Sequence, residues 1–200
     1  MNCISPITLR QKVKDAFDVE RETLITVPCG KCAACLSRRK DDWIFRLKKE
    51  FYNSKYSVFV TLTYNDLSVP TSPDGTPSLR MADVSDFMKR LRKRIGTGVR
   101  FFGCGEYGKE TNRPHYHLLL FNVPETVERD IRAAWPWGHI KVDTLTEGRI
   151  AYTCKYVLTS TQMHDGLPFT FGSNGMSARN LLYDLAIALQ SALVSLPKLP

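Results

Sequence analysis

The sequence has 200 residues, enough to bury the core of one domain with a modest extra segment. Its 43% hydrophobic and 24% charged residues are ordinary globular proportions and exclude a chain that is mainly disordered. The net charge of +8 favours a polyanionic partner, most commonly nucleic acid, although many basic domains bind no polyanion.

The first half of the chain predicts a basic helix followed by a strand. Residues 1–35 hold four of the six cysteines and show little periodicity. Residues 36–52 predict a basic amphipathic helix, because apolar residues recur there at helical spacing between lysines and arginines. Residues 56–64 (YSVFVTLTY) are dense in β-branched and aromatic residues and predict a strand. A loop rich in Pro, Gly and Ser follows, over residues 65–78.

Next come a second helix and a strand pair. Residues 84–95 predict a helix with Asp83 as its N-cap. Residues 99–106 and 115–121 predict two strands joined by a polar loop, as in a β-hairpin.

The remaining elements complete the expected fold. Pro124 is predicted to begin a third helix, residues 139–142 form a short strand, and Gly148 introduces a fourth helix over residues 150–159. The order of elements indicates an α+β fold, with a central, mainly antiparallel sheet and helices packed on it.

Three segments are expected along the chain. The first is the cysteine-rich segment 1–35, and the second is the domain over residues 36–165. The third is a tail over residues 166–200, in which residues 181–194 could form an apolar helix.

Neither export nor membrane insertion is predicted. The longest apolar stretch, residues 185–196, is short and interrupted by polar residues. The N-terminus lacks the basic and apolar regions of a secretory signal. We therefore expect a cytoplasmic protein, in the bacterial host if the chain is viral, whose cysteines are metal ligands or free thiols.

Two histidines on one predicted strand suggest a metal site. Strand side chains alternate, so His115 and His117 point to the same face, and the strand is apolar enough on both faces to be central. Buried imidazoles need polar partners, and a divalent cation would satisfy both. The alternative is two partly exposed histidines at a strand end.

Glu106 is the expected third ligand, because it ends the preceding strand and lies across the hairpin from the histidines. Two histidines and one acid leave coordination positions open, as a catalytic site needs. This ligand set suits Mn²⁺ or Mg²⁺, with Mn²⁺ favoured by the imidazoles. The alternative for Glu106 is a surface acid at a turn.

The fourth predicted helix carries two tyrosines on one side. Tyr152, Lys155, Tyr156 and Thr159 fall within an arc of roughly 100° on a helix, opposite an apolar face. A tyrosine can act as a nucleophile in phosphoryl transfer, and a nearby cation such as Lys155 would stabilise its phenolate. The alternative is a pair of amphipathic surface tyrosines.

The N-terminal cysteines form a candidate structural zinc site. Cys29 and Cys32 have the spacing of zinc ligands, Cys35 follows three residues later, and Cys3 would have to fold back. The alternative is free thiols in a reducing cytoplasm. The other two cysteines, Cys104 and Cys154, are expected to be small core residues.

Basic residues on two predicted helices and before the histidine strand are candidate contacts to DNA phosphates. The alternative is that these charges are simply solvated. The candidates are Arg38, Arg39, Lys40, Arg90, Arg94 and Arg113.

Three motifs in a fixed order carry a family resemblance. They are the strand FVTLTY at residues 59–64, the sequence PHYH at 114–117 preceded by GEYG at 105–108, and YTCKY at 152–156. In this order they resemble the HUH endonucleases, and most of all the rolling-circle replication initiators of microviruses, especially the gokushovirus branch. The resemblance covers about residues 27–160, including the CGKC sequence at 29–32.

This resemblance implies a nicking and joining enzyme, with residues 36–165 as its nickase domain. A tyrosine attacks single-stranded DNA at the origin, leaving a 5′-phosphotyrosine link and a 3′-hydroxyl that a host polymerase extends, with a helicase as a further partner. The second tyrosine later cuts the regenerated origin, and the displaced strand is rejoined without a nucleotide cofactor.

The resemblance also implies a role for each motif residue. Tyr152 and Tyr156 act as nucleophiles assisted by Lys155, and His115, His117 and Glu106 hold the metal. The family helix often has a second lysine where this chain has Thr159.

Other functions remain open from the sequence. The chain could be a relaxase or single-strand transposase of the same superfamily, or a zinc-containing protein that binds single-stranded nucleic acid without catalysis. A basic α+β domain with incidental histidines is the remaining alternative. Covalent capture of DNA separates the enzymes from the binding proteins.

Overall fold

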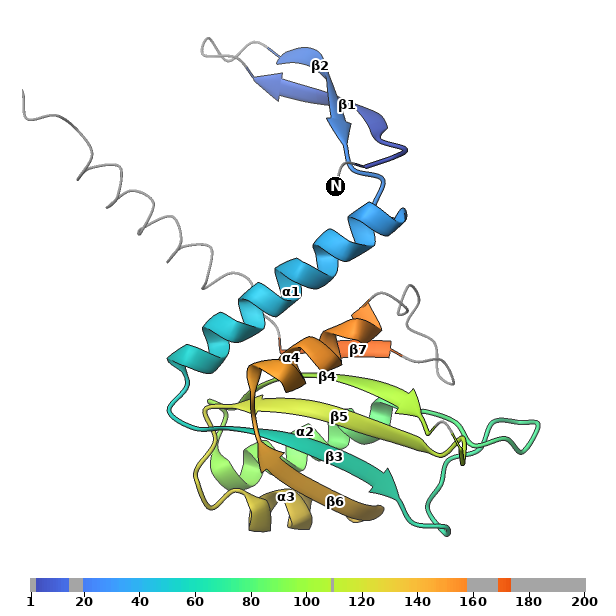
Figure 1. The fold of residues 1–200 in the computed structure, drawn as a ribbon, viewed down its shortest axis with the longest axis vertical. Coiled ribbons are helices and arrows are strands. Elements are labelled where there is room, and N and C mark those ends of the chain that lie inside the picture. The colour runs from blue at the N-terminus through green and yellow to red at the C-terminus, as the bar shows by residue number, and fades with distance from the viewer. Residues whose placement is uncertain (1–2, 15–19, 109, 158–168, 174–200) are drawn as a thin grey trace, which may run out of the picture. The chain divides into compact units, whose positions relative to one another are not determined.

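A computed structural model describes residues 3–14, 20–108, 110–157 and 169–173 of the chain. The chain divides into two compact units, Met1–Asp42 and Trp43–Pro200. Figure 1 labels their helices and strands. Among the described residues, no helix combines the length and apolar character needed to cross a membrane.

The first unit contains an antiparallel hairpin that the sequence analysis did not predict. Strand β1 (Ile7–Lys14) pairs with β2 (Glu20–Val27), and Ile7 lies opposite Val27. Helix α1 (Ala33–Asn53) begins in this unit and continues into the second. It begins three residues before the predicted start at residue 36.

The second unit is built on a five-stranded antiparallel sheet. Its strands are β3 (Ser57–Tyr64), β4 (Arg100–Tyr107), β5 (Pro114–Phe121), β6 (Gly138–Thr144) and β7 (Phe169–Gly172), in the spatial order β6-β3-β5-β4-β7. Every pairing is antiparallel. The predicted α+β class is confirmed, and β5 is central, as its two apolar faces indicated. Strand β7 was not predicted.

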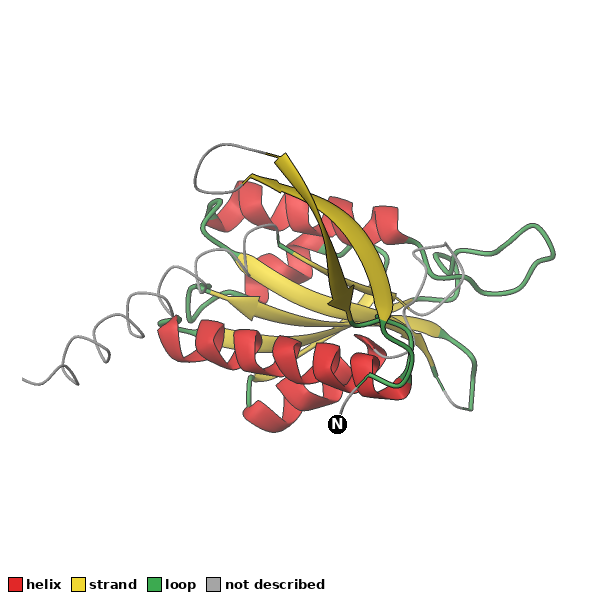
Figure 2. Cartoon of the chain, turned by 90° about the horizontal axis from the view of Figure 1, so that it is seen from above, coloured by secondary structure: helices red, strands yellow, loops and turns green. Residues whose placement is uncertain are grey.

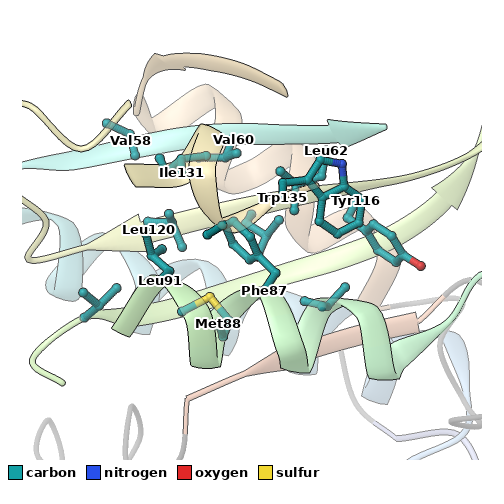
Figure 3. Packing of buried hydrophobic residues seen from close by; sticks show 14 of the residues in the cluster. Val58, Val60, Leu62, Phe87, Met88, Leu91, Tyr116, Leu120, Ile131 and Trp135 are labelled. Atoms are coloured by element: carbon teal, nitrogen blue, oxygen red, sulfur yellow. The ribbon is translucent and has the colours of Figure 1, made fainter. Parts of the chain in front are cut away.

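One face of the sheet is covered by α2 (Met81–Ile95) and α3 (Glu128–Ala134). Residues at alternate positions of β3 and β5 pack against Phe87, Leu91 and Ile131 from these helices, and against Trp135. Figure 3 shows this cluster, in which Trp135 and Tyr116 lie at one end. The prediction that Trp135 belongs to the core is confirmed, because only 2% of its surface is exposed.

The opposite face of the sheet carries α4 (Glu147–Cys154) and the part of α1 that belongs to the second unit. Leu119 and Phe121 of β5 pack there with Leu47 of α1 and Ile150 of α4. Figure 2 shows helices on both faces of the sheet. Cys104 and Cys154 are fully buried, as predicted.

Three predicted helix boundaries were wrong. Arg80, not Asp83, is the N-cap residue of α2, because the Asp83 carboxylate is buried and accepts a hydrogen bond from the Tyr64 hydroxyl at 2.7 Å. Pro124 opens a turn, and α3 begins only at Glu128.

The fourth helix also differs from its prediction. Helix α4 begins at Glu147, before the predicted residue 150, because the Thr146 hydroxyl caps it by accepting from the Arg149 amide. It gives way after Cys154 to a short 3-10 helix, η1 (Lys155–Val157). Thr159 and the predicted apolar helix over residues 181–194 lie outside the described residues.

Candidate active site

The two histidines of β5 converge on a glutamate of the neighbouring strand β4. Glu106 lies directly opposite His115 in the antiparallel register, so all three side chains share one face of the sheet. Oε1 of Glu106 is 2.9 Å from Nε2 of His115 and 2.7 Å from Nε2 of His117. The hairpin that the sequence predicted therefore brings its three candidate ligands together.

This cluster fits a divalent cation. The three ligand atoms all lie within 4.8 Å of one another. Ligands held about 2.1 Å from a small divalent cation, at right angles to each other, are about 3 Å apart, which matches the two Glu106–histidine distances. Two imidazoles and a carboxylate suit Mn²⁺ or Mg²⁺, and three protein ligands leave coordination positions for a substrate.

The remaining ring nitrogens of the histidines are held by neighbouring groups. Nδ1 of His115 is 3.1 Å from the Arg113 carbonyl oxygen, and Nδ1 of His117 is 3.1 Å from the Thr61 hydroxyl. Such contacts fix the orientation of metal-binding imidazoles and turn their Nε2 atoms toward the ion. The sequence analysis assigned Thr61 no role, although it is the cross-strand neighbour of His117.

Replacing Thr61 with Val is therefore expected to weaken Mn²⁺ binding by roughly 10- to 100-fold, because the His117 ring loses its orienting partner. Titration of the purified variant with Mn²⁺ measures this change. Thr63→Val is the matched control: it lies on the same strand, but its hydroxyl donates to the His139 carbonyl oxygen. Equal Mn²⁺ affinity in the Thr61 variant and the wild type would rule out this role.

The protonation of the cluster favours metal binding at neutral pH. Burial alone would raise the pKa of Glu106, but hydrogen bonds from His115, His117 and Tyr152 lower it to about 2. Burial opposes a charged His115, yet the hydrogen bond to Glu106 outweighs it and raises the pKa of that imidazole. Since metal ligation needs a neutral imidazole, metal affinity falls as the pH drops through the raised pKa of His115.

Both tyrosines reach this cluster from α4 and η1. The Tyr152 hydroxyl donates to Oε1 of Glu106 at 2.9 Å, and the Tyr156 hydroxyl lies 3.3 Å from that of Tyr152. Burial and the Glu106 carboxylate raise the pKa of Tyr152 to about 12. Neutralising the Glu106 charge would remove the part of this rise that the carboxylate causes.

Lys155 lies close to the tyrosine pair but not at the hydroxyl of Tyr152. Its Nζ is 5.2 Å from the centre of the Tyr152 ring, over the ring face, and the side chain is exposed. The predicted help from Lys155 to the phenolate therefore stays a prediction. The same ring of Tyr152 meets His117 edge-on, with 5.6 Å between the ring centres.

The candidate DNA contacts of the second unit have partners within the protein. Nε of Arg90 donates to the Ala134 carbonyl oxygen at 2.8 Å, and Arg94 pairs with Asp130 at the same distance. Arg113 donates to the Tyr64 carbonyl oxygen and pairs with the exposed Asp66. These bonds give the three arginines structural roles, and their contact with DNA stays a prediction.

Arg113 also lines an open hollow of about 360 Å³ together with His139 and the end of β3. The other candidate contacts lie on α1 in the first unit. Arg39 is exposed there, and Lys40 pairs with Asp41 at 3.8 Å. Arg38 lies on the same helix.

The four N-terminal cysteines are also brought together, all within the first unit. Sγ of Cys29 is 4.0 Å from that of Cys35, and Sγ of Cys32 is 3.9 Å from that of Cys3. The predicted return of Cys3 to the other three is thus observed.

Comparison with known proteins finds phage replication proteins. The family model for replication-associated protein ORF2 matches residues 57–161, which include the glutamate, both histidines and both tyrosines. Replication-associated protein ORF2 of Spiroplasma virus 4 is 29% identical over 171 residues, covering 74% of this chain and 53% of the relative.

Two further relatives are similar. Replication-associated protein ORF4 of Chlamydia phage 1 is 26% identical over 166 residues, covering 72% of this chain and 40% of the relative. Replication-associated protein VP4 of Bdellovibrio phage phiMH2K is 26% identical over 185 residues, covering 78% of this chain and 57% of the relative. The chain thus spans about half the length of these relatives.

Proposed function

Because the chain belongs to the replication-associated protein ORF2 family, we propose that it initiates rolling-circle replication by nicking single-stranded DNA with a tyrosine. One observation carries the proposal. A single atom, Oε1 of Glu106, lies within hydrogen-bond distance of both histidines and of the Tyr152 hydroxyl. A candidate nucleophile and a candidate metal centre therefore meet at one point.

The proposed reaction is a transesterification at phosphorus. The Tyr152 oxygen bonds to the phosphorus, the bond from phosphorus to the 3′-oxygen breaks, and the phenolic proton leaves toward its nearest acceptor, Glu106 or the Tyr156 hydroxyl. A Mn²⁺ or Mg²⁺ ion bound by Glu106, His115 and His117 would supply a Lewis acid that draws charge from the phosphate. The products are a 5′-phosphotyrosine ester and a free 3′-hydroxyl.

Tyr156 is proposed as the nucleophile of a second cleavage. Its hydroxyl is only 3.3 Å from that of Tyr152, so a small movement of the DNA would present a second phosphate to it. Attack by the new 3′-hydroxyl on the first phosphotyrosine then circularises the displaced strand. The ester keeps the energy of the original bond, so joining needs no nucleotide cofactor.

The proposed partners follow from this reaction. The substrate is single-stranded origin DNA, contacted by basic side chains such as Arg39 and Arg113. A host polymerase extends the 3′-hydroxyl and a host helicase opens the duplex, which places the reaction in the bacterial cytoplasm.

The proposal is tested by incubating the full chain with Mn²⁺ and either circular single-stranded DNA or labelled hairpin oligonucleotides. We expect a covalent protein–DNA band on a denaturing gel, which disappears when a chelator replaces the metal. Blunt duplex of the same sequence is the control and should give no band. Tight binding of single-stranded DNA without any covalent product would contradict the proposal and favour a non-catalytic binding protein.

A further inference from the structure

The four cysteines of the first unit converge from three separate stretches of chain. Cys3 comes from the N-terminal segment, Cys29 and Cys32 from the turn after β2, and Cys35 from the first turn of α1. Gly30 occupies the turn between Cys29 and Cys32 with a φ of +73°, a conformation that glycine adopts without strain. The local fold therefore presents both sulfur atoms of this pair on one side.

The spacing of the sulfur atoms matches a tetrahedral zinc site. All four Sγ atoms lie within 4.8 Å of one another, with contacts of 3.9 and 4.0 Å. Zinc–sulfur bonds of about 2.3 Å in a tetrahedron place the sulfur atoms about 3.8 Å apart. A disulfide needs sulfur atoms about 2.05 Å apart, so these contacts are not disulfides.

Backbone amides support negative charge on the sulfur atoms. The Cys29 amide donates to Sγ of Cys3 at 3.3 Å, and the Cys32 amide donates to Sγ of Cys29 at 3.4 Å. Hydrogen bonds from amides stabilise charged acceptors more than neutral ones, and zinc binds the thiolate form of cysteine. This arrangement distinguishes the cluster from a chance group of thiols.

The β1–β2 hairpin also needs an external source of stability. Its apolar side chains are largely exposed, with Ile7 and Leu9 each 46% exposed and Leu24 69% exposed. A two-stranded hairpin without a packed face is marginally stable at best, and small units of this kind commonly depend on a metal or a disulfide. The cysteine cluster lies where the hairpin ends and α1 begins.

We propose that Cys3, Cys29, Cys32 and Cys35 bind one zinc ion in a closed structural site. Four protein ligands leave no coordination position for a substrate, in contrast to the cluster of Glu106, His115 and His117. The zinc ion would tie the N-terminal segment and the end of β2 to the first turn of α1. The family match begins at residue 57, so it assigns nothing to this cluster.

The metal content of the purified full chain tests this site. We expect one zinc per chain that survives a dialysis against chelator sufficient to remove Mn²⁺. Cys32→Ser and Cys35→Ser should each lose it, whereas Cys104→Ala, which changes a buried cysteine outside the cluster, should keep it. Wild-type protein without zinc, with iron in its place, or with zinc retained in both serine variants would overturn the proposal.

Two further measurements separate loss of zinc from general misfolding. Cobalt-substituted protein should show thiolate charge-transfer and tetrahedral ligand-field absorption, which Cys32→Ser lacks. Hydrogen exchange should speed up over residues 7–14 and 20–27 when zinc is stripped, with β3 and β5 unchanged. Unchanged exchange in the hairpin would overturn the stabilising role, and an octahedral cobalt spectrum would overturn the four-cysteine site. Since His117→Ala leaves this zinc in place, failure of nicking and failure of zinc binding are distinguishable.

Discussion

Replacement of Tyr152 with Phe is expected to reduce formation of the covalent protein–DNA adduct by on the order of 10³-fold or more, because the variant lacks the attacking oxygen. Of the two tyrosine hydroxyls, that of Tyr152 hydrogen-bonds Glu106 directly, and that of Tyr156 lies beyond it. Tyr152 is therefore the better placed to attack a phosphate held at Glu106, His115 and His117. Quantification of the adduct on denaturing gels with a labelled oligonucleotide measures the effect.

Tyr156→Phe is expected to behave differently in the same assay. Adduct formation should stay within about tenfold of wild type, because the primary nucleophile is intact, while release of a rejoined circle should be lost. Tyr52→Phe is the matched control: this tyrosine is 66% exposed and its hydroxyl bonds Glu147 instead of the cluster. An adduct that survives in Tyr152→Phe but is lost in Tyr156→Phe would reverse the assigned order.

The sheet of the second unit was largely predictable because its strands carry strong local signals. Residues 57–64 and 114–121 are dense in β-branched, aromatic and leucine residues. An apolar strand on both faces must be buried on both faces, which identified β5 as central. The short strand β7 has only four residues, too few for alternation to be detected, and it pairs with β4 only through the tertiary fold.

The N-terminal hairpin was missed although its alternation was readable. Ile7, Leu9 and Val13 occupy one face of β1, but the cysteines drew the interpretation of this region toward metal binding alone. Asp83 shows a different limit. An acid before an apolar run resembles a helix cap, yet the buried hydroxyl of Tyr64 needs an acceptor and takes this carboxylate. That demand is visible only in three dimensions.

The candidate site shows the same division between local and tertiary information. The hairpin between β4 and β5 follows from sequence, so Glu106 could be placed opposite His115. The contact of Thr61 with His117 needs the pairing of β3 with β5, which joins residues 56 positions apart. Charge patterns alone could not show that Arg90 and Arg94 are held by groups inside the protein.

Glu106→Gln is expected to lower Mn²⁺-dependent nicking by more than about 100-fold, since even a partner of a metal ligand is worth 10- to 100-fold in metal affinity. The amide keeps the size of the side chain and removes the charge that the cation needs. The same change removes the contribution of the carboxylate to the raised pKa of Tyr152. If Glu106 acted only by restraining that tyrosine, the variant would nick faster, which is the opposite sign.

Two measurements on this variant decide between those effects. Mn²⁺ should raise the melting temperature of the wild type through ligand binding but leave that of Glu106→Gln nearly unchanged, and excess Mn²⁺ should restore part of the nicking. Glu147→Gln is the matched control, because Glu147 bonds Lys48 and Tyr52 on the exposed start of α4, away from the histidines. A Glu106 variant that nicks as fast as the wild type, with the same melting response to Mn²⁺, would show that the cation binds elsewhere. The histidine strand would then be a structural feature of the sheet, and the chemistry of Tyr152 would need another source of positive charge.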